Sequence, residues 1–196
     1  MLIREDLLLS SGAKIGTYTK GQFIFKENTE VHSYFQILTG KVKIVSHQKK
    51  GREFIHNIPT SGDCLGEIFL FLQHQYSVSA VAMEKSSIFI LERSNFALIL
   101  KNNPDILLQL YKCMAENMHY NYLMNGQNVE TPAEKTIKLL QYLKNSNQLT
   151  ASNQVLLSRQ EIASLTGLRV ETIIRTVKYL QSIGTVTIVN GKIIFE

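Results

Sequence analysis

Short, mainly apolar stretches that are rich in β-branched and aromatic residues occupy the first half of the chain. Glycines or polar clusters such as Lys20-Gly21 and Thr39-Gly40 separate them. They cover residues 14–18, 22–26, 33–38, 41–47, 53–59, 77–83 and 86–91. Short strands at near-even spacing are typical of a β-sandwich or a jelly-roll barrel. The pattern therefore predicts a β-barrel domain over residues 1–102, which ends in a short helix over 93–101.

A long helix is predicted next, because Asn103 is an acceptable N-cap and Pro104 suits the first helical position. Within it, a set of residues is spaced alternately by four and three, which is the pattern of a coiled-coil seam over about three heptads. The set consists of Leu107, Tyr111, Met114, Met118, Asn121 and Asn125. We interpret residues 103–128 as a dimerisation helix and hinge. The alternative is a helix that packs on its own barrel through Leu108, Leu110 and Cys113.

The last part of the chain, residues 129–196, contains helices whose ends the sequence marks well. Thr131 and Glu134 have the spacing of a capping box, which opens an amphipathic helix over 131–144. We expect Ile137, Leu140 and Leu143 to be buried in this helix.

A second capping box, formed by Ser158 and Glu161, opens a predicted helix over 159–166. Gly167 ends this helix, because glycine adopts a positive φ at low cost, and another helix over 169–182 follows. The pair Asn190-Gly191 is favoured in the type I′ turn of a β-hairpin. We expect the two helices to bury Ile162, Ala163, Leu165, Ile173 and Val177. Helix, turn, helix and hairpin in this order predict a winged helix-turn-helix.

The second of these helices has side chains outside its buried positions that suit a DNA major groove. Arginine can bind guanine through two hydrogen bonds, and glutamate can accept from the amino group of cytosine. We assign base reading to Val170, Glu171, Thr172 and Arg175. Phosphate binding sets register without carrying sequence information, and we assign it to Ser158, Arg159, Gln160, Arg169, Lys178 and Lys192. The alternatives are a solvated helix face and an intrahelical ion pair between Glu171 and Arg175.

Composition agrees with a nucleic-acid partner. Of the formal net charge of +5, residues 131–196 carry +4, from eight lysines and arginines against four aspartates and glutamates. Such an asymmetry steers a protein towards phosphate. The two cysteines, Cys64 and Cys113, make neither a disulfide framework nor a metal-ligand spacing. No apolar run reaches the roughly 18 residues of a membrane span, and the N-terminus lacks a secretory pattern. We therefore expect a cytoplasmic protein without a membrane partner.

These features together resemble the Crp–Fnr family of bacterial transcription regulators, over nearly the whole chain. Gly40 before a strand, Ser61-Gly62-Asp63, Leu65-Gly66-Glu67 and Asn103-Pro104 fall where the family has equivalent motifs. The resemblance implies an α+β fold, with an N-terminal jelly-roll barrel of cyclic-nucleotide-binding type as effector or sensor domain. It also implies a homodimer that binds palindromic double-stranded DNA, and that contacts RNA polymerase if it is an activator.

Residues 170–175 resemble the Fnr branch, which has Val-Glu-Thr-Ile-Ser-Arg there, more than the cyclic AMP receptor branch. By that likeness Glu171 and Arg175 read a half-site similar to TTGAT. Ile174 replaces a base-contacting serine, and we expect it to touch a thymine methyl group instead. Ile174 therefore joins the base-reading residues.

The expected effector pocket departs from that of the cyclic-nucleotide-binding members. In those members a Gly-Glu pair binds the ribose, and an arginine followed by serine or threonine binds the cyclic phosphate. Gly66, Glu67 and Ile68 keep the first motif, but Tyr76 stands in place of the arginine, followed by Ser77. Loss of the guanidinium removes a charge-assisted bidentate interaction. The sequence thus predicts a degenerate pocket and argues against cyclic AMP. The alternative is a regulator or adaptor that responds to a cyclic nucleotide or another small molecule bound near residues 64–78.

Other cofactors and an enzymatic role have less support in the sequence. An iron–sulfur cluster needs about four cysteines, and none of the five histidines is marked out as a haem ligand. We therefore expect no cofactor. No His-x-His motif of the metal-dependent cupins occurs, and no Ser/His/Asp or Cys/His constellation stands out, so we expect no enzyme. Cys113 is a candidate redox switch at the seam, or else a small buried hydrophobe.

Overall fold

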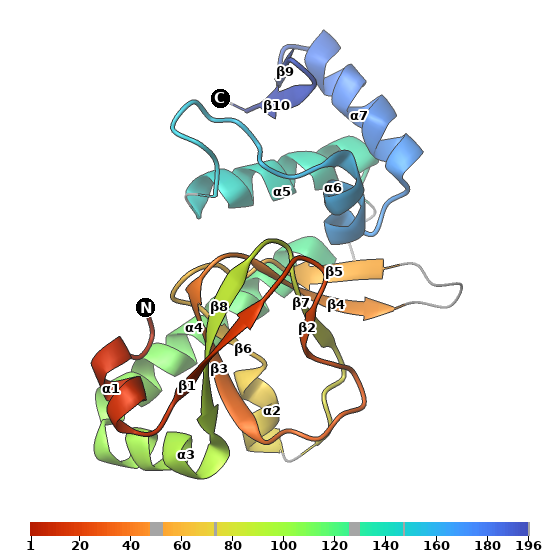
Figure 1. Ribbon diagram of the computed structural model, residues 1–196. Coiled ribbons are helices and arrows are strands. Elements are labelled where there is room, and N and C mark those ends of the chain that lie inside the picture. The colour runs from red at the N-terminus through yellow and green to blue at the C-terminus, as the bar shows by residue number, and fades with distance from the viewer. Residues whose placement is uncertain (48–52, 73, 126–129, 147, 196) are drawn as a thin grey trace. The chain divides into compact units, whose positions relative to one another are not determined.

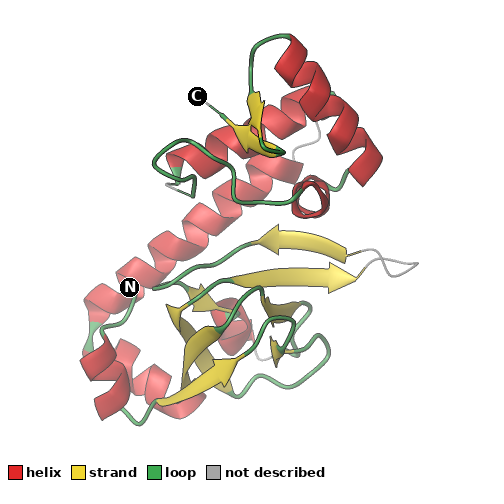
Figure 2. Ribbon diagram, turned by 45° about the horizontal axis from the view of Figure 1, so that its top comes forward, coloured by secondary structure: helices red, strands yellow, loops and turns green. Residues whose placement is uncertain are grey.

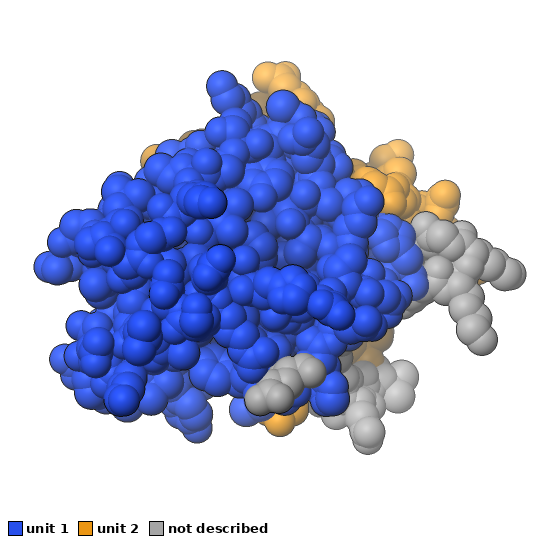
Figure 3. Space-filling view, turned by 60° about the horizontal axis from the view of Figure 1, so that its bottom comes forward, with its two compact units in different colours: residues 1–118 blue, residues 119–196 orange. Residues whose placement is uncertain are grey.

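Ten strands and seven helices are distributed over two compact units of the described chain, residues 1–118 and residues 119–196 (Figure 3). The computed structural model describes residues 1–196 apart from 48–52, 73, 126–129, 147 and 196.

The first unit is built on two antiparallel sheets of four strands each (Figures 1 and 2). The first sheet has the order β1 (Lys14–Tyr18), β8 (Ser86–Glu92), β3 (Ser33–Thr39) and β6 (Cys64–Leu65). The second has the order β2 (Phe23–Phe25), β7 (Ser79–Ala82), β4 (Val42–His47) and β5 (Glu53–Asn57). β1 pairs with β8, β2 with β7, β3 with β6 and β4 with β5. The first strand in the sequence thus pairs with the last, and each following strand pairs with the next one inwards. This is the order of a jelly roll.

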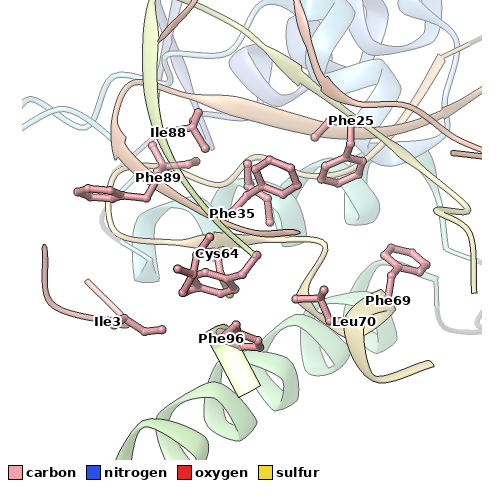
Figure 4. Close-up of a cluster of buried hydrophobic side chains, with 14 of the residues drawn as sticks. Ile3, Phe25, Phe35, Cys64, Phe69, Leu70, Ile88, Phe89 and Phe96 are labelled. Atoms are coloured by element: carbon pink, nitrogen blue, oxygen red, sulfur yellow. The ribbon is translucent and has the colours of Figure 1, made fainter. Parts of the chain in front are cut away.

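Helices α1 (Glu5–Ser10), α2 (Glu67–Leu72), α3 (Arg93–Asn102) and the first part of α4 (Pro104–Asn125) complete this unit. Its core gathers aromatic side chains from strands and helices, among them Phe25, Phe35 and Phe96 (Figure 4). Gln36 is fully buried among them, and a buried amide is costly unless it is paired. Its side chain accepts from the backbone N–H of Ile3 at 2.9 Å and donates to the Ile3 carbonyl at 2.8 Å. This pairing attaches the N-terminal residues to β3.

The turn between β3 and β4 requires glycine. Gly40 has φ +104°, and a Cβ at this position would lie 2.8 Å from the backbone Cα of Ser86. Only a residue without a side chain combines that backbone conformation with so close an approach. The two sheets are therefore joined tightly at this point.

Helix α4 packs one face on the barrel and leaves the other exposed. Leu110 is buried in the barrel core, while Ile106, Cys113 and Met114 are partly buried against it. The side-chain amide of Asn103 donates to the carbonyl of Ile99 at 2.8 Å, so this residue closes the end of α3 just before α4 begins.

The second unit contains the last turns of α4 together with α5 (Pro132–Asn145), α6 (Arg159–Thr166), α7 (Val170–Ser182) and the hairpin of β9 (Thr187–Val189) and β10 (Lys192–Ile194). The rings of Tyr120 and Tyr142 lie 4.4 Å apart, which packs the end of α4 on α5. Asn190 and Gly191 have φ of 49° and 75°. The positive φ predicted for both residues of the hairpin turn is therefore confirmed.

The predicted α+β architecture of barrel, long helix and winged helix is confirmed, with four local differences. The sequence pattern missed α1, α2 and the two-residue strand β6. Ile137, predicted to be buried in α5, is only partly buried, because Thr136 and Leu139 occupy the inner positions beside Leu140. The Thr136 hydroxyl can take such a position since it donates to the carbonyl of Pro132 at 2.7 Å.

Candidate nucleic-acid interface and candidate effector pocket

The helix-turn-helix is held by a capping box and a left-handed turn. The Ser158 hydroxyl accepts from the backbone N–H of Glu161 at 3.2 Å, and the Glu161 carboxylate accepts from the backbone N–H of Ser158 at 2.6 Å. Gly167 ends α6 with φ 69°. Ile162, Ala163, Leu165, Ile173 and Val177 are all buried, as predicted. These contacts fix how α7 is presented at the surface of its unit.

Removal of this cap should loosen α6. We expect Ser158→Ala to lower the stability of the second unit by about 1 kcal/mol, because one backbone N–H at the helix start loses its acceptor. Urea unfolding and hydrogen exchange at the first amides of α6 would measure the loss. Ser146→Ala is the matched control, since Ser146 is exposed and donates to the Tyr142 carbonyl through its backbone N–H at 2.9 Å. Equal stability of the Ser158→Ala variant and the wild type would contradict the prediction.

Helix α7 presents the predicted base-reading residues on its N-terminal half. Glu171, Ile174 and Arg175 are exposed, with Ile174 at 42%, while Val170 and Thr172 are partly buried. The ion pairs of the described residues do not include Glu171 with Arg175. Instead, Nε of Arg175 donates to the backbone carbonyl of Glu171 at 3.4 Å, a long and weak contact. Both charged groups are therefore available to another molecule.

The residues predicted to bind phosphate lie at the start of α6, along α7 and in the hairpin. Ser158, Gln160, Arg169, Lys178 and Lys192 are exposed and Arg159 is partly buried. The Arg159 guanidinium donates to the Gly191 carbonyl at 3.3 Å. This contact ties α6 to the turn of the hairpin, so Arg159 also has a structural partner within its unit.

The candidate effector pocket is closed by aromatic rings. Tyr76 is 2% exposed and stacks on Phe25 with ring centroids 3.9 Å apart, and its ring lies 5.4 Å from that of Phe69. A Cβ on Gly66 would lie 2.9 Å from Phe25 and 3.0 Å from Tyr76. Of the predicted pocket residues, Gly66 and Tyr76 thus lie against each other, and Glu67 is buried. Ile68 and Ser77 are exposed instead.

Two polar groups in this region are buried. Glu67 is 5% exposed, and burial raises the pKa of its carboxyl group. Burial also raises the pKa of Tyr76 to about 12. The Tyr76 hydroxyl is buried without a hydrogen-bond partner in the described part of the chain. A buried hydroxyl that lacks a partner costs stability, typically about 1–3 kcal/mol.

We expect Tyr76→Phe to leave the protein as stable or to stabilise it by up to about 2 kcal/mol, because the variant removes an unpaired hydroxyl and keeps the ring stack. Chemical denaturation with a linear-extrapolation fit would measure the difference. Tyr34→Phe is the matched control, because the Tyr34 hydroxyl donates to the Gln36 side chain at 2.8 Å and its loss should destabilise. A loss of more than about 1 kcal/mol in Tyr76→Phe would mean that the hydroxyl has a partner.

The face of α4 that is not packed on the barrel is apolar. It includes part of the predicted seam and a second row of residues that starts at Leu108 and not at Leu107. Among the predicted residues, Leu107, Tyr111 and Met118 are exposed at 46%, 72% and 54%, and Asn121 is exposed as well. Met114 is half-buried against the barrel core, and the side chain of Asn125 lies outside the described residues. Leu108, which the alternative interpretation placed against the barrel, is instead 68% exposed. Leu108, Tyr111, Ala115 and Met118 follow the same alternation of three and four.

Neither a metal-binding cluster nor a membrane-spanning helix occurs in the described part of the chain. No group of three or more His, Cys, Asp or Glu side chains is arranged there to hold a metal ion. The described helices include none that is long and apolar enough to cross a bilayer.

A jelly-roll barrel followed by a long helix and a winged helix-turn-helix defines a two-module class of regulators. Residues 15–103 match the family model described as a cyclic nucleotide-binding domain, and residues 156–186 match the one described as bacterial regulatory proteins, crp family. The chain belongs to the Crp–Fnr family.

Curated relatives and solved structures agree with this placement. The cAMP-activated global transcriptional regulator CRP of Salmonella typhimurium is 26% identical over 190 residues, which cover 94% of this chain and 90% of that protein. The nitrogen fixation regulation protein FixK of Bradyrhizobium diazoefficiens is 23% identical over 184 residues, 90% of this chain and 75% of that protein. The structure of FixK2 from Bradyrhizobium japonicum superposes with a TM-score of 0.76 at 22% identity, over 94% of this chain and 92% of that one. This last likeness supports the fold.

Proposed function

We propose that the protein is a homodimeric, sequence-specific DNA-binding transcription regulator. The observation that carries the proposal is the exposed N-terminal half of α7, which presents Glu171, Ile174 and Arg175 next to the left-handed turn at Gly167. In helix-turn-helix proteins, the start of the second helix meets the base edges in the major groove. The family relationship favours the same role here.

Base reading is assigned to three different kinds of contact. Arg175 would bind guanine through two hydrogen bonds, Glu171 would accept from a cytosine amino group, and Ile174 would pack on a thymine methyl group. Val170 and Thr172 flank these contacts. We propose a half-site similar to TTGAT, on the strength of the Fnr-like stretch over residues 170–175.

Phosphate contacts would come from Ser158, Gln160, Arg169, Lys178 and Lys192. Arg159 would add a contact through the guanidinium donors that its bond to Gly191 leaves free, because a guanidinium has five N–H donors. Contacts of this kind make affinity fall steeply with salt concentration.

Dimerisation is assigned to the outer face of α4. Leu107, Leu108, Tyr111 and Met118 are apolar side chains that a monomer would leave in water, and such a contiguous apolar stripe marks a protein interface. A two-fold dimer places two recognition helices about one helical turn of DNA apart, which requires a palindromic operator. If the protein is an activator, RNA polymerase is a further partner.

The barrel is proposed to have lost cyclic-nucleotide binding. A cyclic phosphate requires a cation to pair with it, and Tyr76, which replaces the family's arginine, is neutral and stacked on Phe25. The residues present therefore do not fit that ligand. The alternative, an effector bound near residues 64–78, has one observation in its favour, since a ligand acceptor would satisfy the unpaired hydroxyl of Tyr76.

Cyclic AMP is expected to leave the midpoint of thermal unfolding unchanged. A ligand at one hundred times its dissociation constant would add about 2.7 kcal/mol of stability, which differential scanning fluorimetry would detect. Linear AMP at the same concentrations is the control for weak, non-specific anion binding. A rise in the midpoint with cyclic AMP alone would contradict the degenerate pocket and favour the alternative.

The function itself is tested by DNA binding of the purified protein without additives. Fluorescence anisotropy on a TTGATNNNNATCAA duplex and a scrambled duplex, over a series of salt concentrations, separates specific from electrostatic binding. Tight binding that prefers the palindrome is the expected result. Equal, weak binding to both duplexes would argue against this half-site, and a random-site selection would then follow. Complete absence of binding at low salt would reject the proposed function.

A further inference from the structure

The hairpin of β9 and β10, which forms the wing, is fixed at its base and open at its tip. At the base, the backbone N–H of Val155 donates to the Ile193 carbonyl at 2.8 Å, and Val186 and Ile193 are buried. At the tip, residues 190–192 are exposed, and a Cβ on Gly191 would meet no atom within 4 Å. Packing therefore holds the base of the wing but does not hold its tip.

A hydrogen bond from α6 reaches this tip. Nη2 of Arg159 donates to the carbonyl oxygen of Gly191 at 3.3 Å. This carbonyl belongs to the peptide bond that joins Gly191 to Lys192, so the bond acts on the backbone that carries Lys192. Although 3.3 Å is a long distance for a hydrogen bond, the positive charge of the guanidinium strengthens it. Arg159 is also partly buried, which restricts the side chain that makes the bond.

We infer that Arg159 is a positioning residue, which holds the tip of the wing so that Lys192 contacts the DNA backbone. The inference rests on the proposed function, in which the start of α6 and Lys192 both bind phosphate. A wing that moves freely must lose conformational freedom when it binds, whereas a wing held by Arg159 presents Lys192 already in place. Arg159 would thus strengthen DNA binding through Lys192 as well as through its own contact.

The charges at this place suit a common anionic partner. The ion pairs of the described residues include neither Arg159 nor Lys192. Partial burial lowers the pKa of the Arg159 guanidinium, but arginine remains protonated near neutral pH. Two cations on neighbouring parts of the unit repel each other in the free protein, and a phosphate backbone beside them would relieve that repulsion.

Backbone dynamics of the free protein test the contact without DNA. We expect Arg159→Ala to lower the heteronuclear nuclear Overhauser effect at the amides of residues 190–192, because the tip then moves on the ps–ns timescale. Gln160→Ala, at the exposed next position of α6, is the matched control and should leave these values unchanged. Circular dichroism checks the fold, and Arg159→Gln is the second variant if Arg159→Ala fails to fold. Wild-type values at the tip in a folded Arg159 variant would overturn the inference.

A double-variant cycle on the TTGATNNNNATCAA duplex tests whether Arg159 acts through Lys192. Lys192→Ala should lower the salt dependence of binding by about two units of slope, one for each copy in the dimer. Arg159→Ala should lower it by up to about four units, because the contacts of both residues are lost. The double variant should then lower the slope no further than Arg159→Ala alone.

Additive losses would contradict a positioning role. A decrease of about two units for each single variant and about four for the double variant would make Arg159 an independent phosphate contact. Gln160→Ala combined with Lys192→Ala is the control cycle, and its effects on affinity should add. If the wild type bound no DNA, the proposed function would fail together with the role of Lys192. The amide measurement would in that case still show whether Arg159 holds the tip.

Discussion

Replacement of both Glu171 and Arg175 by alanine is expected to abolish the preference of the protein for its operator. Each good bidentate base contact contributes about 1–3 kcal/mol to discrimination, and a dimer would use two copies of each residue. The preference for the palindromic duplex over the scrambled one should therefore fall by at least about 100-fold. Residual binding should remain, equal on both duplexes and strongly dependent on salt. Anisotropy titrations on the two duplexes measure both quantities.

Two single variants distinguish contacts to bases from electrostatic contacts to phosphates. Arg175→Lys keeps the positive charge but loses the planar pair of donors, so it should lose selectivity nearly as far as Arg175→Ala. Lys178→Ala, at an exposed position of the same helix, should weaken binding to both duplexes alike and lower the salt dependence by about two units of slope, one for each copy in the dimer. If Arg175→Lys kept wild-type selectivity, Arg175 would be a phosphate contact. In that case the assignment of Arg175 to base reading would be wrong.

Charges on the outer face of α4 are expected to dissociate the dimer. Tyr111 and Met118 are 72% and 54% exposed, so Tyr111→Glu with Met118→Glu should leave each protomer folded. Burial of an apolar side chain contributes about 1.5–3 kcal/mol, so two substitutions that also bring like charges together should weaken the dimer by at least about 100-fold. Sedimentation velocity over a concentration series measures the dissociation constant, and circular dichroism checks the fold.

Gln109→Glu is the control for the charge of each single substitution, because it adds one negative charge to an exposed position of α4 outside the apolar alternation. Leu108→Glu tests the register that starts one residue after the predicted seam, since Leu108 is 68% exposed. A Tyr111→Glu, Met118→Glu variant that stayed dimeric would place the interface elsewhere. A dimer broken equally by Gln109→Glu would show a general charge effect.

The seam illustrates where sequence reasoning reaches its limit. An alternation of three and four identifies a helix with an apolar stripe, but α4 has two such stripes one residue apart. Leu110 and Met114 belong to the stripe that packs on the barrel, whereas Leu108 and Tyr111 belong to the exposed one. Periodicity is a local property and gives both stripes the same weight. The barrel selects the stripe that it buries.

What the sequence determined by itself are the features that depend on residues a few positions apart. The two capping boxes, the left-handed Gly167 and the Asn190-Gly191 turn are local, because each rests on backbone geometry and side chains within one helical turn or hairpin. The order of strands and helices followed from periodicity in the same way.

Contacts between distant segments were decided only by the tertiary structure. The pairing of β3 with β6 and the stacking of Tyr76 on Phe25 each join segments separated by dozens of residues. No local preference encodes such contacts, since they arise when a whole core packs and each buried side chain must fill the space left by the others. The sequence therefore predicted the local elements, and the fold decided which distant side chains pack against each other.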